Sequence, residues 1–329
     1  MQDKTWKNPG DENHLLDHIV FVGGAPRSGT TFAAKSLNLH PAFVAAIDDH
    51  VYECWGLYYY RKRSGLVQTM RSRPLAAEEA REILRTHLVV NDQLVGAATS
   101  DKTKGFPPAA KNLSFFPGSV PSQWENNLVR HSIPLAQFSK PWRLCLKSPE
   151  ISFVLPQLAS NFPGALFVLV YRPIEEIAES MYRKGNSVKR LPVYQKRWID
   201  EKTMAGELIP PPGVPVQWEN LWQTATDFQR CVIYAASYLR GILEGVAELA
   251  AGRYFIYNHL DLRNTPQRIF QSLAQFLHVE ASGFQMAQTR LKTDKPLIDE
   301  HLKKEYIAVE DEMELNTIMR QLESITGSI

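Results

Sequence analysis

The sequence has few cysteines and no long apolar run, and each absence excludes a class of protein. Cys54, Cys145 and Cys231 are its three cysteines among 329 residues, and no two of them have the CxxC spacing of a zinc or redox site. We therefore expect a reduced compartment and no structural metal. No segment has the roughly 18 consecutive apolar residues that span a bilayer, and the polar, acidic start is unlike a signal peptide. We expect a cytoplasmic protein.

An excess of charge of one sign is also missing. The 37 basic and 35 acidic residues give a net charge of +2, which argues against a nucleic-acid binder that relies on a global positive field but leaves room for a local basic pocket. Internal repeats and low-complexity tracts are absent as well. Because 44% of the residues are hydrophobic, the chain can bury a large core.

Short apolar runs alternate with helical patterns along most of the chain. We predict strands at residues 18–22, 42–47, 142–146, 165–171 and 254–257 and helices at residues 32–39, 74–94, 149–161, from 173, 218–250 and 265–277. Strands separated by helices imply an α/β fold with a parallel β-sheet flanked by helices on both faces. We predict a single domain, 1–329, with irregular substrate-facing insertions at about 96–141 and 185–216.

A glycine-containing turn follows the first predicted strand. Gly24 and Gly29 have the spacing of the phosphate-binding loop GxxxxGK[ST], and the turn joins a strand to a helix as that motif requires. Glycine lets backbone N–H groups point inward, and a helix N-terminus favours an anion. Ser28, Thr30 and Thr31 add hydroxyl donors, so the turn predicts a phosphate ligand. The alternative is a glycine turn with no ligand.

The turn departs from the loops of kinases and GTPases at one position. Thr30 stands where those loops carry a lysine that reaches the β- and γ-phosphates, and the cation is placed earlier, as Arg27. This disfavours ATP or GTP as a phosphoryl donor. The core of the turn, Pro-Arg-Ser-Gly-Thr-Thr, resembles the 5′-phosphosulfate loop of the sulfotransferases that use 3′-phosphoadenosine 5′-phosphosulfate (PAPS).

That resemblance implies a P-loop NTPase-like sulfotransferase fold, with PAPS as cofactor and no metal. It also implies that the cofactor's 5′-phosphate is held by Arg27, Ser28, Gly29, Thr30 and Thr31. Arg27 would in addition offset the charge that develops on the bridging oxygen as the sulfuryl group leaves.

A second segment resembles the 3′-phosphate-binding element of the same family. There an arginine ends a strand and a serine lies eight residues later; here these are Arg172 and Ser180. The guanidinium offers paired donors to phosphate oxygens. The alternative is an ordinary exposed arginine at a strand end. A weaker resemblance covers residues 254–260, and residues 290–295 are a candidate for the basic loop that closes over the 3′-phosphate in the cytosolic branch.

The groups that would carry out transfer lie in two other segments. Lys147, at the end of a predicted strand, resembles the lysine that the carbohydrate and tyrosine branch places near the transferring group; the alternative is a lysine pointing to solvent. Asp48, Asp49 and His50 are candidates for the general base, because a carboxylate fills this role in that branch and imidazole titrates near neutral pH. The sequence does not choose among these three, and a polar loop without a catalytic role is the alternative.

We therefore predict a PAPS-dependent sulfotransferase that acts on a hydroxyl or amine of a small-molecule acceptor, such as a secondary metabolite or a carrier-bound group. We expect no nucleic-acid or membrane partner, and a homodimer is left open. The alternatives are a P-loop kinase or nucleotide hydrolase with an altered loop, and an inactive nucleotide-binding module.

Overall fold

A computed structural model shows how the predicted elements assemble. It describes residues 18–46, 75–81, 89–90, 93–95, 132–134, 143–187, 208, 210–211, 213–285, 300–311 and 313–326.

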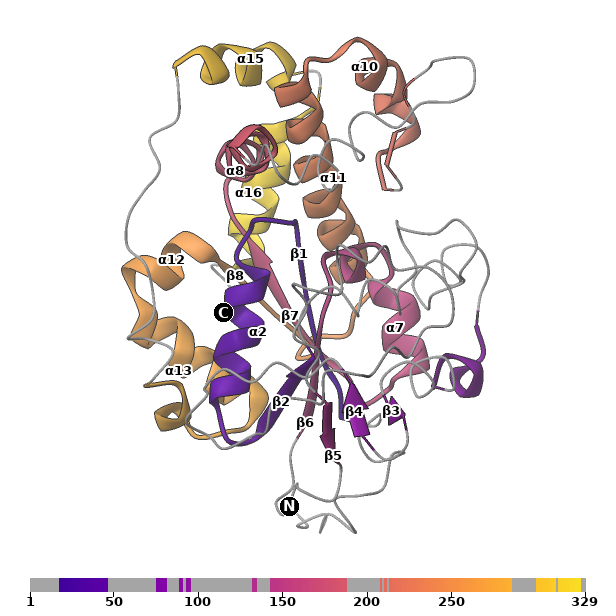
Figure 1. Ribbon diagram of the computed structural model, residues 1–329, viewed down its shortest axis with the longest axis vertical. Helices are drawn as coiled ribbons and strands as arrows, with labels where there is room; N and C mark the ends of the chain where they lie inside the picture. Colours follow the sequence, from indigo (N-terminus) through magenta and orange to yellow (C-terminus); the bar gives the residue numbers. More distant parts are fainter. Residues whose placement is uncertain are drawn as a thin grey trace.

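A five-stranded parallel sheet forms the centre of the molecule (Figure 1). Its strand order is β2-β6-β1-β7-β8, and the bounds are β1 Val20–Gly24, β2 Phe43–Ala46, β6 Arg143–Lys147, β7 Leu166–Tyr171 and β8 Tyr254–Asn258. All four strand pairings are parallel. Each predicted strand is therefore confirmed to within two residues at either end.

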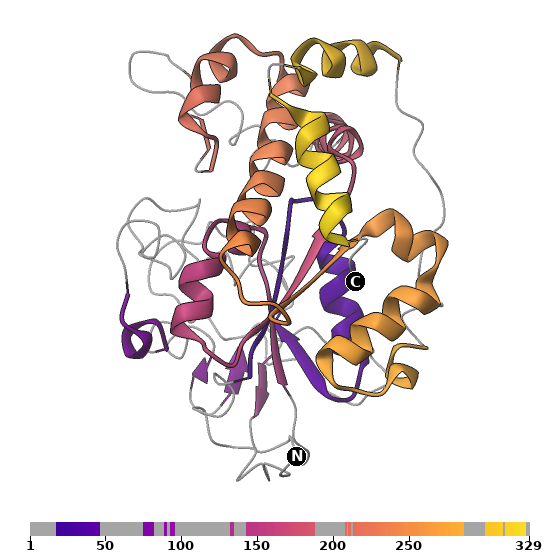
Figure 2. The same ribbon diagram turned by 180° about the vertical axis from the view of Figure 1, so that it is seen from behind.

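Helices cover both faces of the sheet, as the sequence predicts. One face packs against α2 (Thr30–Leu39), α13 (Pro266–Leu277) and the 3-10 turn η5 (Ala281–Phe284), with the short α12 (His259–Asn264) leading into α13. The other face packs against α7 (Leu155–Asn161), α8 (Ile174–Ser187), α11 (Asp227–Ala247), α15 (Glu300–Glu310) and α16 (Leu315–Thr326). Figure 2 shows α11 and α16 side by side on the near side of the molecule. In β1, Val20 and Val22 face the first layer and Phe21 the second, which explains the uninterrupted apolar run.

The strand register brings four loops to the same edge of the sheet. Val22 in β1 lies opposite Lys147 in β6, and Gly24 lies opposite Val170 in β7. Tyr171 in turn lies opposite Asn258 at the end of β8. The segments that follow β1, β6, β7 and β8 therefore start from the same carboxyl edge, where parallel-sheet proteins gather their ligands.

Two predicted helices are each divided in the structure. The helix predicted at 149–161 is the 3-10 turn η3 (Pro149–Phe153) followed by α7, because Val154 has φ −139° and interrupts the helical path. The helix predicted at 218–250 is α10 (Glu219–Thr224) followed by α11. Thr226 separates them with a capping box. Its hydroxyl accepts a hydrogen bond from the Gln229 N–H, and the Gln229 side-chain oxygen accepts one from the Thr226 N–H.

The helix predicted at 74–94 is wrong at residues 89–90 and 93–94, which are strands. Residues 77–81 are helical, but β3 (Val89–Val90) and β4 (Gln93–Val95) pair antiparallel, and β5 (Ser132–Pro134) adds a third strand. β-branched valines in adjacent positions favour a strand over a helix, and this local preference outweighs the helical charge pattern upstream. The prediction of one domain with insertions at 96–141 and 185–216 stays a prediction, since most of both insertions lies outside the described residues. Within the insertions, residues 132–134 form β5 and residues 185–187 belong to α8.

Among the described residues, no helix is long and apolar enough to cross a membrane. Cys145 and Cys231 are buried free thiols, and Cys54 lies outside the described residues.

Candidate functional site

The turn between β1 and α2 has the backbone of an anion-binding loop. Gly24, Arg27 and Gly29 all have positive φ, of 143°, 72° and 108°. The Ser28 N–H bonds to the Ala25 carbonyl at 3.1 Å, which closes the turn just before the helix begins at Thr30. A left-handed conformation is unusual for a residue with a side chain, so the surrounding structure holds Arg27 in a strained backbone state.

Both glycines are also required by close packing. A Cβ on Gly24 would overlap the carbonyl oxygen of Val170, and a Cβ on Gly29 would lie 2.6 Å from Nδ1 of His259. Neither position has room for a side chain, so the sequence motif reflects contact as well as conformation. The Gly24 N–H is satisfied from outside the turn, because it donates to the Ser152 hydroxyl of η3 at 3.1 Å.

Two of the three hydroxyl residues at the turn are buried. Ser28 is fully buried and Thr30 is 3% exposed, whereas Thr31 is partly exposed. The Ser28 Oγ has no hydrogen-bond partner among the described residues. Because buried polar atoms nearly always have a partner, this unpartnered hydroxyl indicates a ligand or an ordered water at the turn.

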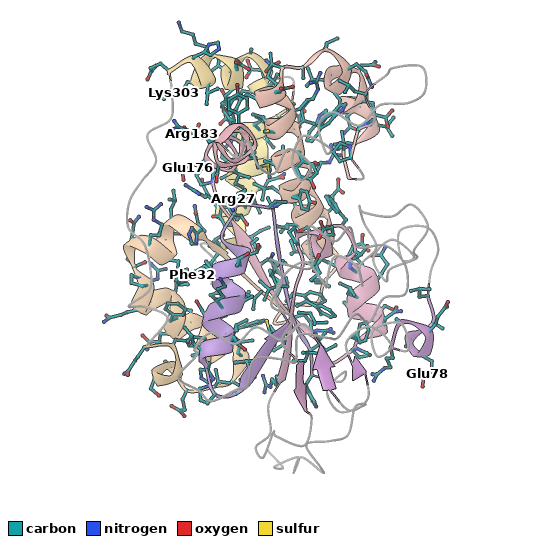
Figure 3. All side chains as sticks on the ribbon, in the orientation of Figure 1. Arg27, Phe32, Glu78, Glu176, Arg183 and Lys303 are labelled. Atoms are coloured by element: carbon teal, nitrogen blue, oxygen red, sulfur yellow. The ribbon has the colours of Figure 1, made fainter. Side chains whose placement is uncertain are left out.

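The two segments singled out by sequence meet in the structure. Nε of Arg27 donates to Oγ of Ser180 in α8 at 3.2 Å, although the two residues are 153 positions apart in sequence. Burial, and next the charge of Arg172, lower the pKa of Arg27. The strand-end arginine therefore lies within electrostatic reach of the turn, and the turn contacts α8 at this point; Figure 3 shows Arg27 above α2 and below Glu176 and Arg183 of α8.

Arg172 is a buried guanidinium. It is 9% exposed, so the alternative of an ordinary surface arginine is wrong. Its Nε pairs with Oε2 of Glu176 at 2.5 Å, a contact between residues one helical turn apart that fixes the guanidinium at the start of α8. Arg27 and Arg172 together place two positive charges at the turn of residues 24–31, which we call the phosphate turn. Such an arrangement is stabilised by a bound anion.

Lys147 ends β6 in the strand next to β1. It is 4% exposed, so the alternative of a lysine pointing to solvent is wrong. Glu150, three residues later, is fully buried and accepts a hydrogen bond from the Ser148 hydroxyl. Burial raises the pKa of Glu150, while the charge of Lys147 acts in the opposite direction. The positive charge of Lys147 thus acts on a buried carboxyl group near the carboxyl edge of the sheet.

His259 is a site residue that the sequence analysis missed. It follows β8 as the first residue of α12, and its ring lies against Gly29 and, edge to face, 6.1 Å from the ring of Phe32. Its Nδ1 is buried without a hydrogen-bond partner among the described residues. The signal available in the sequence was its position at the end of a parallel strand, the same criterion that selects Lys147 and Arg172.

The sequence of the chain matches the family model described as "Sulfotransferase family" over residues 20–208, more than half of its length. The chain belongs to the sulfotransferase family. The match contains the phosphate turn, Lys147, Arg172 and Ser180. The family match agrees with the fold that the turn predicts. The function of the protein is sulfuryl transfer.

Several solved structures are similar to this sulfotransferase over most of its length. They include a sulfotransferase from Alicyclobacillus acidocaldarius (10% identity over 94% of this chain and 95% of that chain, TM-score 0.48) and sulfotransferase STF9 from Mycobacterium avium (13% identity, 90% and 76%, TM-score 0.44). A third is the sulfotransferase domain of the Synechococcus PCC 7002 olefin synthase (15% identity, 98% and 97%, TM-score 0.42). No curated protein is significantly similar to the chain in sequence. The family assignment rests on the sequence match.

Other predicted groups of the sulfotransferase fall outside the part of the chain that the structure describes. These are the candidate bases Asp48, Asp49 and His50 and the candidate lid at residues 290–295. Among the residues that the structure does describe, no cluster of three or more His, Cys, Asp or Glu side chains could hold a metal ion.

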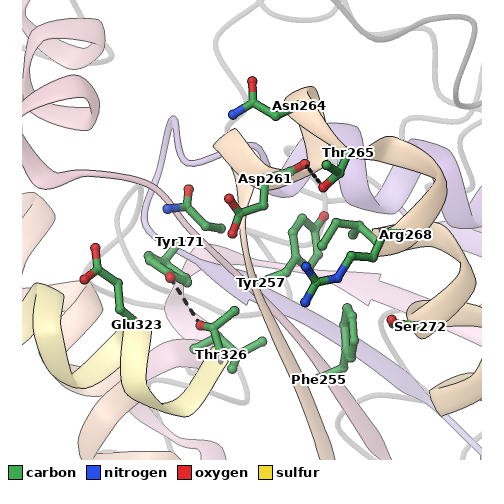
Figure 4. Close-up of a pocket in the computed structure, with 13 residues that line it drawn as sticks. Tyr171, Phe255, Tyr257, Asp261, Asn264, Thr265, Arg268, Ser272, Glu323 and Thr326 are labelled. Carbon is green, nitrogen blue, oxygen red and sulfur yellow. Dashed lines mark hydrogen bonds between the residues drawn. The ribbon is translucent and has the colours of Figure 1, made fainter. Parts of the chain in front are cut away.

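A cavity of about 580 Å³ lies at the free edge of β8 (Figure 4). Asp261 of α12, Arg268 of α13 and Glu323 of α16 face it, and Phe255 and Tyr257 form part of its wall. It does not include the predicted phosphate-binding residues. The cavity beside β8 and the phosphate turn are therefore separate features of the molecule.

Proposed function

We propose that this sulfotransferase takes its sulfuryl group from PAPS and releases adenosine 3′,5′-bisphosphate. One observation carries the proposal: the Arg27–Ser180 contact joins the phosphate turn to the segment that begins with Arg172. PAPS carries a phosphosulfate on the 5′-oxygen and a phosphate on the 3′-oxygen of one ribose. Two adjacent cationic sites of different origin in the sequence suit such a ligand better than they suit a linear triphosphate.

The two sites divide the nucleotide between them. The turn would hold the 5′-phosphate through backbone N–H groups at the N-terminus of α2, the buried residues Ser28 and Thr30, and the neighbouring Thr31. Arg172 and Ser180 would hold the 3′-phosphate, with Glu176 fixing the guanidinium. Arg27 lies between the two sites, where it can also stabilise negative charge on the leaving 5′-phosphate oxygen.

Transfer in line requires a base for the acceptor and cations for the migrating group. The acceptor oxygen or nitrogen forms a bond to sulfur while the bond from sulfur to the 5′-phosphate oxygen breaks, and the acceptor proton passes to a base. Lys147 would stabilise the equatorial oxygens of the migrating group from the neighbouring strand end. Asp48, Asp49 and His50 are the proposed candidates for the base.

The acceptor that we propose is a small molecule with a free hydroxyl or amine. A net charge of +2 gives no broad surface field to attract a polyanionic glycan or nucleic acid. We further propose a cytoplasmic location, on the strength of the cysteine content, and a homodimer remains open as the assembly.

Thermal unfolding with matched nucleotides tests the proposal. Adenosine 3′,5′-bisphosphate at about 100 times its Kd should stabilise the protein by roughly 2.7 kcal/mol, because a ligand that binds only the folded state shifts the equilibrium by mass action. ATP with magnesium at the same concentration should raise the Tm much less, since the turn lacks the lysine of a triphosphate loop. Equal or greater protection by ATP would overturn the proposal in favour of a kinase or hydrolase.

A further inference from the structure

His259 is a partly buried polar side chain to which the proposed chemistry gives no role. Its backbone position is fixed, because the Asn258 side chain caps α12 by accepting from the Leu260 N–H at 2.9 Å. Its Nδ1 has no hydrogen-bond partner among the described residues. The second unpartnered buried atom at the same turn is Ser28 Oγ, so two polar atoms at the turn both lack a partner within the described part of the chain. An unpaired buried polar atom is costly, and two at one turn indicate a shared ligand.

The imidazole closes the phosphate turn from the β8 side. A Cβ on Gly29 would lie 2.6 to 3.0 Å from Nδ1, Cγ and Cε1, so the ring occupies the space beside the first residue of the helix. Phe32 meets the ring edge to face one turn further along α2. The ring therefore packs against the point where the turn joins α2.

The two charges that act on His259, those of Arg172 and Arg263, are both positive. Burial and then the charges of Arg172, at the end of β7, and Arg263, on α12, lower the pKa of His259 to about 4. The imidazole ring also faces Gly29, just before α2, and Phe32 on α2, and neither residue carries a charge. The ring is therefore neutral at pH 7 without a ligand. An anion bound beside Arg172 would offset this positive field and favour the imidazolium form.

We propose that His259 is a positioning residue for the nucleotide, which holds the Gly29 turn in place and becomes, through Nδ1, a charged donor to the bound phosphate group. This inference rests on the proposed function. Binding then takes up a proton from solvent, which the imidazole holds for as long as the nucleotide stays bound. The reaction itself leaves that proton in place, so His259 acts on binding rather than on the transfer step.

Calorimetry at pH 6 in two buffers of different ionisation enthalpy tests the inference, with adenosine 3′,5′-bisphosphate as the ligand. The first variant is His259→Phe, which keeps a ring against Gly29 but removes both nitrogens. We expect its affinity to fall roughly tenfold, the size of one charge-assisted hydrogen bond, and its proton uptake to fall below that of the wild type. The difference in proton uptake between the wild type and the variant excludes the protons that the nucleotide itself takes up. His301→Phe, on the exposed face of α15, is the matched control and should change neither quantity.

The outcomes separate the two proposals. Equal affinity and equal proton uptake in wild type and His259→Phe would overturn the role of His259 and leave the proposed function intact. Failure of the wild type to prefer the bisphosphate over 5′-AMP would overturn both. If His259→Phe does not fold, His259→Gln and the ring signals of the wild type in nuclear magnetic resonance replace it. The His259 signal should move toward the charged form when bisphosphate is added, and an unmoved signal would contradict the inference.

Discussion

At the scale of single residues, the fold keeps two imidazoles neutral, that of His259 beside the phosphate turn and that of His40 at the opposite end of α2. His40, in the loop after α2, accepts from the Ala42 N–H at Nδ1 and is bonded to the Glu280 carbonyl at Nε2, 3.0 Å away. The Nδ1 contact requires an unprotonated nitrogen, so the Nε2–H must be the donor to Glu280. Burial lowers the pKa of His40, although the bond to Glu280 acts against the shift.

These two histidines predict a loss of stability in mild acid. Both pKa values are lower in the folded state than the ordinary value near 6.5, so the unfolded chain binds more protons and the free energy of unfolding falls as pH drops from about 6.5 toward 4. For His259, the loss between pH 7.5 and 5 should be about 2 kcal/mol. Urea unfolding at both pH values measures it.

The variant His259→Phe isolates this contribution from that of the carboxylates. It should lose less stability than the wild type over the same pH interval, while His301→Phe should follow the wild type. Parallel pH dependence in the wild type and His259→Phe would show that the imidazole is not held neutral.

At the scale of elements, the phosphate turn is supported by the segment that follows β6. The Gly24 N–H donates to the Ser152 hydroxyl of η3, so the segment after a neighbouring strand provides a hydrogen-bond partner for the turn. This support depends on the short 3-10 turn that replaces the first part of the predicted helix, because Ser152 would be displaced along a continuous α-helix beginning at Pro149.

The variant Ser152→Ala tests this support. It leaves a buried N–H without a partner, so we expect a loss of about 1 to 3 kcal/mol in the free energy of unfolding together with weaker bisphosphate binding. Ser237→Ala, a buried serine of α11 whose hydroxyl donates to backbone carbonyls of its own helix, is the matched control and should cost less and leave binding unchanged. Similar effects on binding in both variants would contradict the role of Ser152.

How far the sequence predicts the structure also becomes clear at this scale. Apolar runs such as residues 165–171 predict the strands, because a strand covered on both faces must be apolar throughout. The positions of Arg27, Lys147 and Arg172 follow from strand ends. The sequence did not predict the break at Thr226, the hairpin of β3 and β4, or the contact of His259 with Gly29, since each depends on local capping or on packing between distant segments.

At the scale of the whole molecule, the parallel sheet makes one site from four distant segments. β1 provides the turn, β6 provides Lys147, β7 provides Arg172, and β8 provides His259, all from one carboxyl edge. α8 then returns Ser180 to the turn. This sharing predicts that the two proposed phosphate sites act on one nucleotide, rather than as independent anion sites.

Calorimetric titration of the wild type and Arg172→Ala with adenosine 3′,5′-bisphosphate and with 5′-AMP tests this central claim most directly. The account predicts that the substitution weakens bisphosphate binding at least tenfold, the loss of a charge-assisted contact, while 5′-AMP binding changes little. Arg320→Ala, which removes an exposed arginine of α16, should alter neither affinity. An equal loss for both nucleotides in Arg172→Ala would contradict the claim, because Arg172 would then not recognise the 3′-phosphate.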